Sequence, residues 1–263
     1  MRFDIVIGNP PYQDPGSKTQ TNKLWIKFIE KFYEEASEYL YFITPDPWTH
    51  PLSSKSKYKK IFREGRLLLA NVGECAKHFP GIGSSFTYFL LSKIDKRGST
   101  ALTTKEGTVE IDFPSTPWIP KEITSESIEL LQRTLWSEGD RIEFIGSQLP
   151  NRYHSKGQTE EFQYPFCLST STTSWREEKC KYHDSYKVMF PYLASHTKPI
   201  LDLGELGATH GVNLIFDTKE DAVEAYEFYM QEDIQRALQL SKWHHGNANP
   251  QVLKTLPKKT KKS

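Results

Sequence analysis

The sequence has few cysteines, no long apolar run and almost no net charge. Its three cysteines, Cys75, Cys167 and Cys180, are odd in number and far apart, which argues against a disulfide framework and favours a reducing compartment. No stretch approaches the ~18 consecutive apolar residues that a membrane-spanning helix needs, so we expect no membrane association. The N-terminus also lacks the apolar core and small-residue cleavage site of a signal peptide. We therefore expect a cytoplasmic protein.

The cysteines also give no support for a structural metal site. Cys180 and His183 have the spacing of half a site, but no second pair follows at ligand spacing. Structural zinc takes about four ligands. We predict no metal site in this chain.

The composition is that of a globular protein with a real core. Of the 263 residues, 37% are hydrophobic and 13% aromatic, and at ~100–200 residues per domain this length gives one large or two small domains. The net charge of +1 conceals an asymmetry, because residues 258–263 contain four lysines and the rest of the chain carries −3. We expect these last residues to be a disordered basic tail. Any nucleic-acid affinity of the body must come from local patches.

Hydrophobic periodicity divides the chain near residue 95. Short apolar runs alternate with helical patterns before this point, which indicates an α/β sheet. We expect strands at 3–7, 39–44, 66–72 and 85–92, and helices at 23–38 and 55–64. After it, the pattern predicts helices at 125–137 and 219–240, a short alternating run at 108–113 and an irregular region over 146–215. The sequence thus predicts an α/β domain over 1–95 and an α+β region over 96–257.

The most informative residues are Asn9-Pro10-Pro11-Tyr12, directly after the first predicted strand. A strand ends at the carboxyl edge of its sheet, where α/β folds bind their ligands. The Asn9 side-chain oxygen and the Pro10 carbonyl are two acceptors, and Tyr12 offers an aromatic face. This set suits a planar group that bears an amino substituent. A plain turn is the alternative, since Asn-Pro often starts one, but a turn requires neither the second proline nor the tyrosine.

These four residues resemble the (Asp/Asn/Ser)-Pro-Pro-(Tyr/Phe) motif of amino-methyltransferases that act on adenine N6 in DNA, notably the modification enzymes of restriction systems. The resemblance continues in the helix and the proline-ended strand that follow, in Gly73-Glu74, and in Phe79-Pro80 before the strand at 85–92. Residues 211–257 resemble the end of the family's target-recognition domains. The fold implied is a partial Rossmann-like methyltransferase sheet, followed by an α+β target-recognition domain.

The resemblance implies methyl transfer from S-adenosylmethionine to the N6 amino group of adenine. Asn9 and Pro10 would accept the two amino protons, which localises the lone pair on the nitrogen and stabilises the transition state. The adenine must leave the duplex, and the resemblance places Phe79 beside Tyr12 as its stacking partner. Core packing is the plain alternative for both rings. Similar motifs occur in methyltransferases for RNA bases and glutamine side chains, so these acceptors stay open.

The methyl-donor site of this family is a glycine-rich loop that normally precedes the catalytic motif, with an acidic ribose ligand about 20 residues later. Only eight residues precede Asn9, so we expect no donor site upstream in this chain. A permuted order would place the loop at 198–207, with Asp217 or Glu220 on the ribose. Too little sequence follows for the ~30-residue βαβ unit, which favours a turn there. A second chain that supplies the donor-binding half, an inactive remnant and a DNA-binding specificity subunit stay open.

Candidate DNA contacts come from local basic segments. Residues 55–66 hold six basic residues and one acidic residue, a local charge of +5 beside the expected catalytic edge. Residues 152–156 form a polar loop suited to base readout. A solvated helix face is the plain alternative for each lysine. The predicted DNA-contacting residues are Lys55, Lys57, Lys59, Lys60, Arg63, Arg66, Arg152 and His154.

Overall fold

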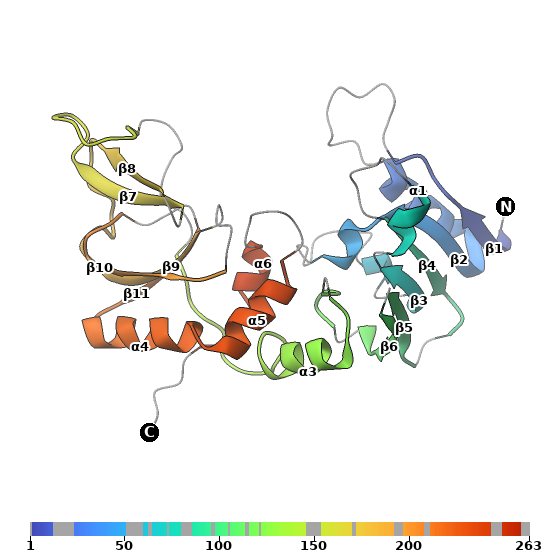
Figure 1. The fold of residues 1–263 in the computed structure, drawn as a ribbon. Helices are drawn as coiled ribbons and strands as arrows, with labels where there is room; N and C mark the ends of the chain where they lie inside the picture. Colours follow the sequence, from blue (N-terminus) through green and yellow to red (C-terminus); the bar gives the residue numbers. More distant parts are fainter. Residues whose placement is uncertain are drawn as a thin grey trace. The chain divides into compact units, whose positions relative to one another are not determined.

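The computed structural model divides into two compact units, Met1–Ser125 and Glu126–Ser263, which are described separately (Figure 1). No helix in the described part of the chain is long and apolar enough to cross a membrane. The described residues are 2–12, 24–50, 60–62, 65–72, 74–79, 86–95, 98–104, 106–113, 116–120, 122–145, 154–169, 172–191, 197–207, 211–242 and 249–258.

A mixed six-stranded sheet forms the first unit. Its strands lie in the order β1-β2-β4-β3-β5-β6. β1, β2, β3 and β5 run in one direction, and β4 and β6 run in the other. The strands are β1 (Phe3–Gly8), β2 (Ala36–Pro45), β3 (Arg66–Val72), β4 (Phe86–Ser92), β5 (Thr100–Thr104) and β6 (Gly107–Ile111). The other elements are helix α1 (Leu24–Glu35) and the short 3-10 helices η1 (Pro47–Thr49) and η2 (Glu74–His78).

The core of this unit lies on the face of the sheet that α1 covers. α1 packs against β2 and buries Trp25 and Ile29. Farther along this face, the Trp48 ring stacks on Phe62 at 4.3 Å between centroids, and Phe62 packs edge-on against Phe89 at 4.7 Å. These fully buried aromatic rings hold η1 and residues 60–62 on the sheet.

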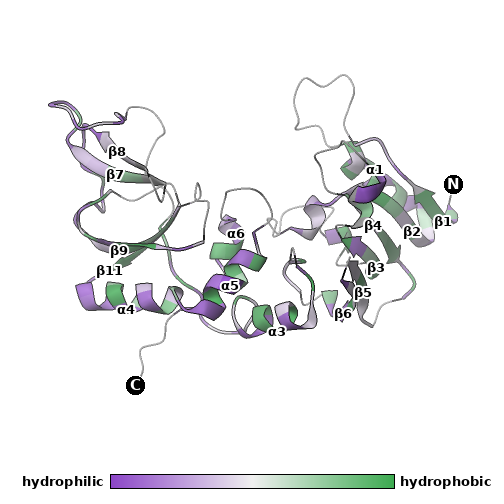
Figure 2. Cartoon of the chain, in the orientation of Figure 1, coloured by the Kyte–Doolittle hydropathy of each residue, from purple (hydrophilic) through white to green (hydrophobic). Residues whose placement is uncertain are grey.

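The second unit contains two small antiparallel sheets and four helices in its described part. β7 (Tyr164–Ser169) pairs with β8 (Thr172–Arg176), and a three-stranded sheet has the order β10-β9-β11. α4 packs against all three strands of that sheet, and hydrophobic and hydrophilic stretches alternate along it (Figure 2). The remaining elements are α3 (Ser125–Arg133), β9 (Tyr186–Pro191), β10 (Ile200–Leu203), β11 (Gly211–Phe216), α4 (Lys219–Tyr229), α5 (Glu232–Leu240) and α6 (Pro250–Leu253).

The segment 198–207 contains the strand β10 and a turn after it, without the βαβ unit that a donor site needs. β10 pairs antiparallel with β9 and ends in a turn where Gly204 adopts a φ of 98°. Asp202 accepts the backbone N–H groups of the two residues that follow Gly204, and its other oxygen pairs with the fully buried ammonium of Lys187. Lys187 also donates to the carbonyls of Tyr182, His183 and Ser185. β10 and β11 run in the same direction, but β9 lies between them and no described helix connects them, so this segment is not part of a βαβ unit.

Several predicted bounds differ from the structure. The helix predicted at 23–38 ends at Glu35, because Ala36 already pairs with β1. The single helix predicted at 219–240 is two helices, because Gln231 has an extended ψ of 141° and separates them. The expectation of irregular structure over 146–215 is wrong, since β7 to β11 lie there.

The boundary expected near residue 95 differs from the division of the structure. β5 and β6 continue the sheet of β1 to β4, so the first compact unit runs to Ser125. The strand predicted at 66–72 is confirmed with the same bounds, and β1 and β2 are each longer than expected. Of the helix predicted at 55–64, only residues 60–62 are described, and they are helical.

Candidate active site

Asn9 lies at the carboxyl edge of the sheet, as its position after the first predicted strand indicates. β1 and β2 are parallel, so Asn9 and the end of β2 at Pro45 lie at the same edge. β3 ends there at Val72, and the antiparallel β4 begins there at Phe86, which pairs with Pro45. The structure therefore gathers the termini of four strands around this motif, at the edge where open α/β sheets bind ligands.

The motif itself forms a rigid turn with an internal hydrogen bond. The Tyr12 hydroxyl donates to Asn9 Oδ1 at 2.5 Å. Pro10 is buried and Pro11 is exposed between them, and each proline restricts its own φ to about −65°. Asn9 is exposed, so its carboxamide can reach a ligand from the surface. The carbonyl oxygen has two lone pairs, and Tyr12 uses one of them.

A shelf of three aromatic rings lies beside this turn. The Tyr12 and Phe86 centroids are 5.0 Å apart, and the Phe79 and Phe86 centroids are 4.6 Å apart. Phe86 is 1% exposed, whereas Tyr12 and Phe79 are half-buried. The structure thus brings the two predicted stacking residues onto one buried ring. Sequence reasoning missed Phe86. The available signal was that Phe86 lies near the start of a predicted strand, but this strand begins beside Asn9 only because it is antiparallel to its neighbours.

Burial sets the protonation of the groups around the shelf. It raises the pKa of the Tyr12 hydroxyl, and the nearby Cys75 thiol raises it further, while the hydrogen bond to Asn9 opposes the shift. Burial also raises the pKa of the Cys75 thiol. Both groups therefore stay protonated at neutral pH. Tyr12 acts as a hydrogen-bond donor, and Cys75 has no reactive thiolate.

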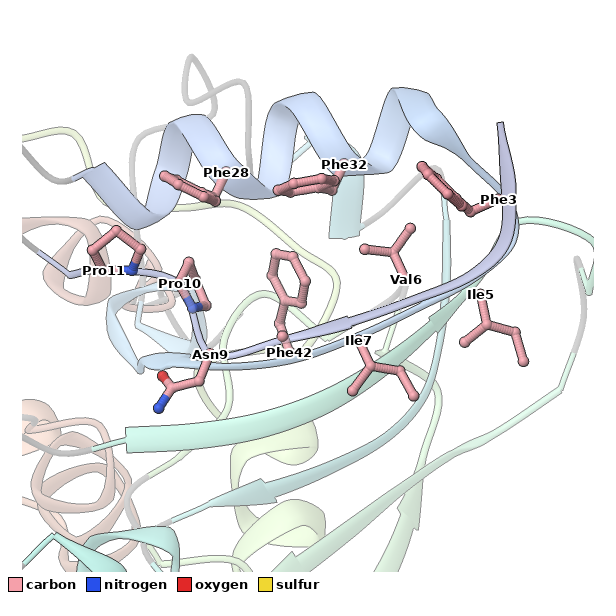
Figure 3. A pocket seen from close by; sticks show the side chains of 11 residues that line it. Phe3, Ile5, Val6, Ile7, Asn9, Pro10, Pro11, Phe28, Phe32 and Phe42 are labelled. Carbon is pink, nitrogen blue, oxygen red and sulfur yellow. The ribbon is translucent and has the colours of Figure 1, made fainter. Parts of the chain in front are cut away.

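An open apolar pocket of about 440 Å³ lies between β1 and α1. Phe28 and Phe32 from α1 and Phe42 from β2 line it, together with Val6 of β1 (Figure 3). The register of β1 against β2 shifts between Phe3 and Ile5, so that Phe3 also points toward this side, as expected at a β-bulge.

The Asn9 carboxamide lies on the other face of β1, on the same side as two solvent-exposed isoleucines. Ile5, Ile7 and Asn9 point away from α1 (Figure 3). Ile5 is 55% exposed and Ile7 is 72% exposed. β1 is also one of the two edge strands of this sheet, so its outer edge has no partner among the described strands. The Asn9 side therefore adjoins an apolar surface at a sheet edge to which no described strand is paired.

Of the predicted DNA-contacting residues, Arg66 does not lie at this edge. Arg66 begins β3, so it lies at the opposite edge of the sheet from Asn9, and its guanidinium donates to the Ser99 carbonyl at 3.2 Å. This is contrary to the expectation that it lies beside the catalytic edge. Lys60 and His154 are exposed, and the His154 ring packs edge-on against Phe166 at 5.8 Å. Lys55, Lys57, Lys59, Arg63 and Arg152 lie outside the described residues.

The described part of the chain contains no group of side chains that could hold a metal ion, and the segment 198–207 does not form a methyl-donor site. No three His, Cys, Asp or Glu side chains among these residues form a metal-binding group. The segment 198–207, which the permuted order requires as the donor loop, leads from β10 to β11 with no described helix between them, these two strands are separated in the sheet by the antiparallel β9, and Asp202 is buried against Lys187. That segment does not fit S-adenosylmethionine.

Several solved structures from restriction-modification systems are similar to this chain. MmeI, a type IIL restriction-modification enzyme in complex with DNA, is 8% identical over 84% of this chain and 42% of that chain, with a TM-score of 0.48. The type IIG restriction endonuclease BpuSI is 11% identical over 96% of this chain and 46% of that chain, with a TM-score of 0.40. A type I methyltransferase subunit from Streptococcus thermophilus is 16% identical over 43% of this chain and 30% of that chain, with a TM-score of 0.31.

The chain spans less than half the length of each of these three proteins. No curated protein matches the sequence. A family model does match the part of the chain that carries the turn at Asn9–Tyr12. Residues 1–69, which contain β1, α1 and β2, match the model of the Eco57I restriction-modification methylases.

Proposed function

We propose that this chain takes part in methyl transfer from S-adenosylmethionine to the N6 amino group of adenine in DNA, and that it supplies the groups that hold the adenine. One observation carries the proposal: Asn9, Tyr12 and Phe86 meet at the carboxyl edge of the sheet. The match of residues 1–69 to a restriction-modification methylase family supports it. We assign recognition of the surrounding DNA to the second unit.

The two acceptors address the chemical difficulty of the reaction. The exocyclic nitrogen of adenine is a poor nucleophile, because its lone pair is delocalised into the ring. Hydrogen bonds from its two protons to Asn9 Oδ1 and the Pro10 carbonyl favour a pyramidal nitrogen with a localised lone pair. Such bonds strengthen as positive charge develops on the nitrogen, so they stabilise the transition state more than the bound substrate. No residue has to remove a proton before the nitrogen attacks.

The aromatic shelf addresses the position of the base. An adenine in a duplex has to flip out of the stack, which costs a few kcal/mol. Stacking on an aromatic side chain contributes about 1–3 kcal/mol per base, enough to offset much of that cost. Tyr12 and Phe79 are half-buried and rest on the buried Phe86 ring, so each keeps ring surface available to a base.

We further propose that a second polypeptide holds the methyl donor. The segment 198–207 is a strand and a turn outside any described βαβ unit, and the outer edge of β1 has no partner among the described strands. Strands of parallel sheets are normally buried on both faces, whereas Ile5 and Ile7 are bare. A strand added parallel to β1 would end beside Asn9, which is where the donor has to lie. An exposed apolar edge strand without such a cover is an aggregation hazard.

Reconstitution tests this function. The protein is mixed with labelled S-adenosylmethionine and adenine-containing DNA, alone and with the product of the neighbouring gene. We expect label in the DNA only when wild-type protein and the second polypeptide are both present. Asn9→Ala should reduce transfer at least about 100-fold, as loss of a transition-state hydrogen-bonding group does elsewhere, while DNA affinity is unchanged. Gln239→Ala, which removes an exposed carboxamide from α5, is the control. Undiminished transfer by Asn9→Ala would refute the mechanism, and transfer to RNA or glutamine instead would refute the substrate.

A further inference from the structure

The hydroxyl of Tyr12 makes a contact that stacking alone does not require. It donates to Asn9 Oδ1 at 2.5 Å, across a turn of two prolines. Neither proline has a backbone N–H, so neither can compete for the carboxamide oxygen. The restricted φ angles of both prolines also keep the two side chains facing each other. The turn is therefore built so that this hydroxyl and this oxygen meet.

The contact matters because the two ends of a carboxamide are chemically opposite. The oxygen accepts hydrogen bonds and the nitrogen donates them. If the side chain of Asn9 rotated by half a turn, its NH₂ group would face the amino group of the substrate, and two donors would oppose each other. Asn9 is exposed, so water could satisfy either orientation. A phenolic hydroxyl can also accept from an NH₂ group, but it is a better donor than acceptor, so its bond to Asn9 Oδ1 favours one orientation and still leaves a lone pair for the substrate.

Tyr12 is suited to this task because its ring is held and its hydroxyl keeps its proton. The ring packs on Phe86 at 5.0 Å, and Phe86 is itself fixed in the core. Side-chain entropy is therefore already lost before a ligand arrives. Burial, and then Cys75, raise the pKa of the hydroxyl above its ordinary value of 10.0. It remains a donor at every pH at which the protein would work.

We propose that the Tyr12 hydroxyl is a positioning group that orients the Asn9 carboxamide, separately from the stacking role of the Tyr12 ring. This inference rests on the proposed function of the site. A competing interpretation is that the hydroxyl occupies Asn9 and must be displaced by the substrate. The two interpretations predict opposite effects when the hydroxyl is removed.

Tyr12→Phe removes the hydroxyl and keeps the ring. In single-turnover methyl transfer with the reconstituted complex, we expect the rate to fall about three- to tenfold, the equivalent of one ordinary hydrogen bond. The affinity for target DNA should change less than about twofold over the same comparison. A rate that is unchanged or faster would overturn the proposal. Tyr41→Phe, which removes another half-buried hydroxyl near Cys75, is the control.

Testing Tyr12→Phe in the Asn9→Asp variant separates an effect on the orientation of Asn9 from a general disturbance of the site. In Asn9→Asp both side-chain oxygens accept hydrogen bonds, so no orientation has to be selected. Adding Tyr12→Phe to Asn9→Asp should therefore cost less than about twofold in rate, by comparison with the single substitution. An equal loss in both backgrounds would show that the hydroxyl does not act by orienting Asn9.

The free protein offers a readout that needs no methyl transfer. With the Asn9 side-chain amide labelled by ¹⁵N and ¹³C, the carbonyl resonance should shift in Tyr12→Phe and stay in place in Tyr41→Phe. An Asn9 signal that ignores Tyr12→Phe would contradict the contact itself. If wild-type protein shows this coupling and yet transfers no methyl group under any reconstitution, the proposed function fails instead, so the two failures are distinguishable.

Discussion

Replacing Phe86 by leucine removes the ring on which Tyr12 and Phe79 rest. Each ring–ring contact is worth about 0.5–1.5 kcal/mol beyond its buried area, so the two contacts together contribute about 1–3 kcal/mol. Leucine keeps the site apolar, so we expect the loss of global stability to be about the 1–3 kcal/mol of the two ring contacts. We therefore expect Phe86→Leu to fold, but with Tyr12 and Phe79 less firmly positioned. The affinity for a flipped base should fall about five- to hundredfold, at about 1.4 kcal/mol for each factor of ten.

A DNA duplex with 2-aminopurine at the target position measures this effect, because the fluorescence of the analogue rises when it leaves the stack. We expect a reduced rise with Phe86→Leu. Phe89→Leu is the matched control, since Phe89 lies on the same strand but packs on Trp48 and Phe62 at the other face of the sheet. It should lower stability to a similar extent and leave the fluorescence unchanged. Equal fluorescence changes with both variants, or with neither, would refute the role of the shelf.

Two further predictions concern the sheet edge and the second unit. Ile7→Asp should weaken association with the donor-binding polypeptide at least tenfold, by about 1.4 kcal/mol or more, as measured by calorimetric titration. Thermal stability should not fall, since Ile7 is 72% exposed. Ile94→Asp is the control, because Ile94 is 52% exposed but lies outside β1, and it should not change the affinity. Lys187→Met should destabilise the second unit by about 3–5 kcal/mol in denaturant unfolding, because it leaves the Asp202 carboxylate buried without its partner. Adding Asp202→Asn to that variant should recover part of the loss, and no recovery would mean that the buried charge is not the cause.

The sequence predicts β1 to β4 of the first unit because these strands are apolar runs, but it does not place β5 and β6 in the same sheet. The sequence places the end of α1 too late, since neither glycine nor proline occurs near the junction of α1 and β2 at Glu35-Ala36. The helical pattern runs on there, and only the pairing of Ala36 with Phe3 starts the strand. Tertiary contacts of this kind override local propensity.

The strands of the second unit are hidden by buried polar residues. Lys187 in β9 and Asn213 in β11 are fully buried, yet they interrupt the apolar runs that mark a strand in the sequence. Lys187 is tolerated only because three carbonyls of the preceding turn and the Asp202 carboxylate of β10 surround its ammonium. A local pattern contains no sign that Asp202, 15 residues further along the chain, pairs with it.

The candidate site was predictable where its chemistry is local and not where it depends on strand direction. Asn9 to Tyr12 are contiguous, so their acceptors and their ring could be inferred together. Phe86 joins them only because β4 runs antiparallel to its neighbours and begins at the edge where β1 ends. Arg66 is excluded for the converse reason, since a strand parallel to β1 begins at the far edge.

The identity of the methylated base tests the central claim most directly. DNA treated with the reconstituted protein and S-adenosylmethionine is digested to nucleosides, which are separated by chromatography and identified by mass spectrometry. N6-methyladenine in wild-type digests, and its absence in Asn9→Ala digests, is the expected result. Methylation of a different base, or N6-methyladenine that persists in Asn9→Ala, would contradict the account.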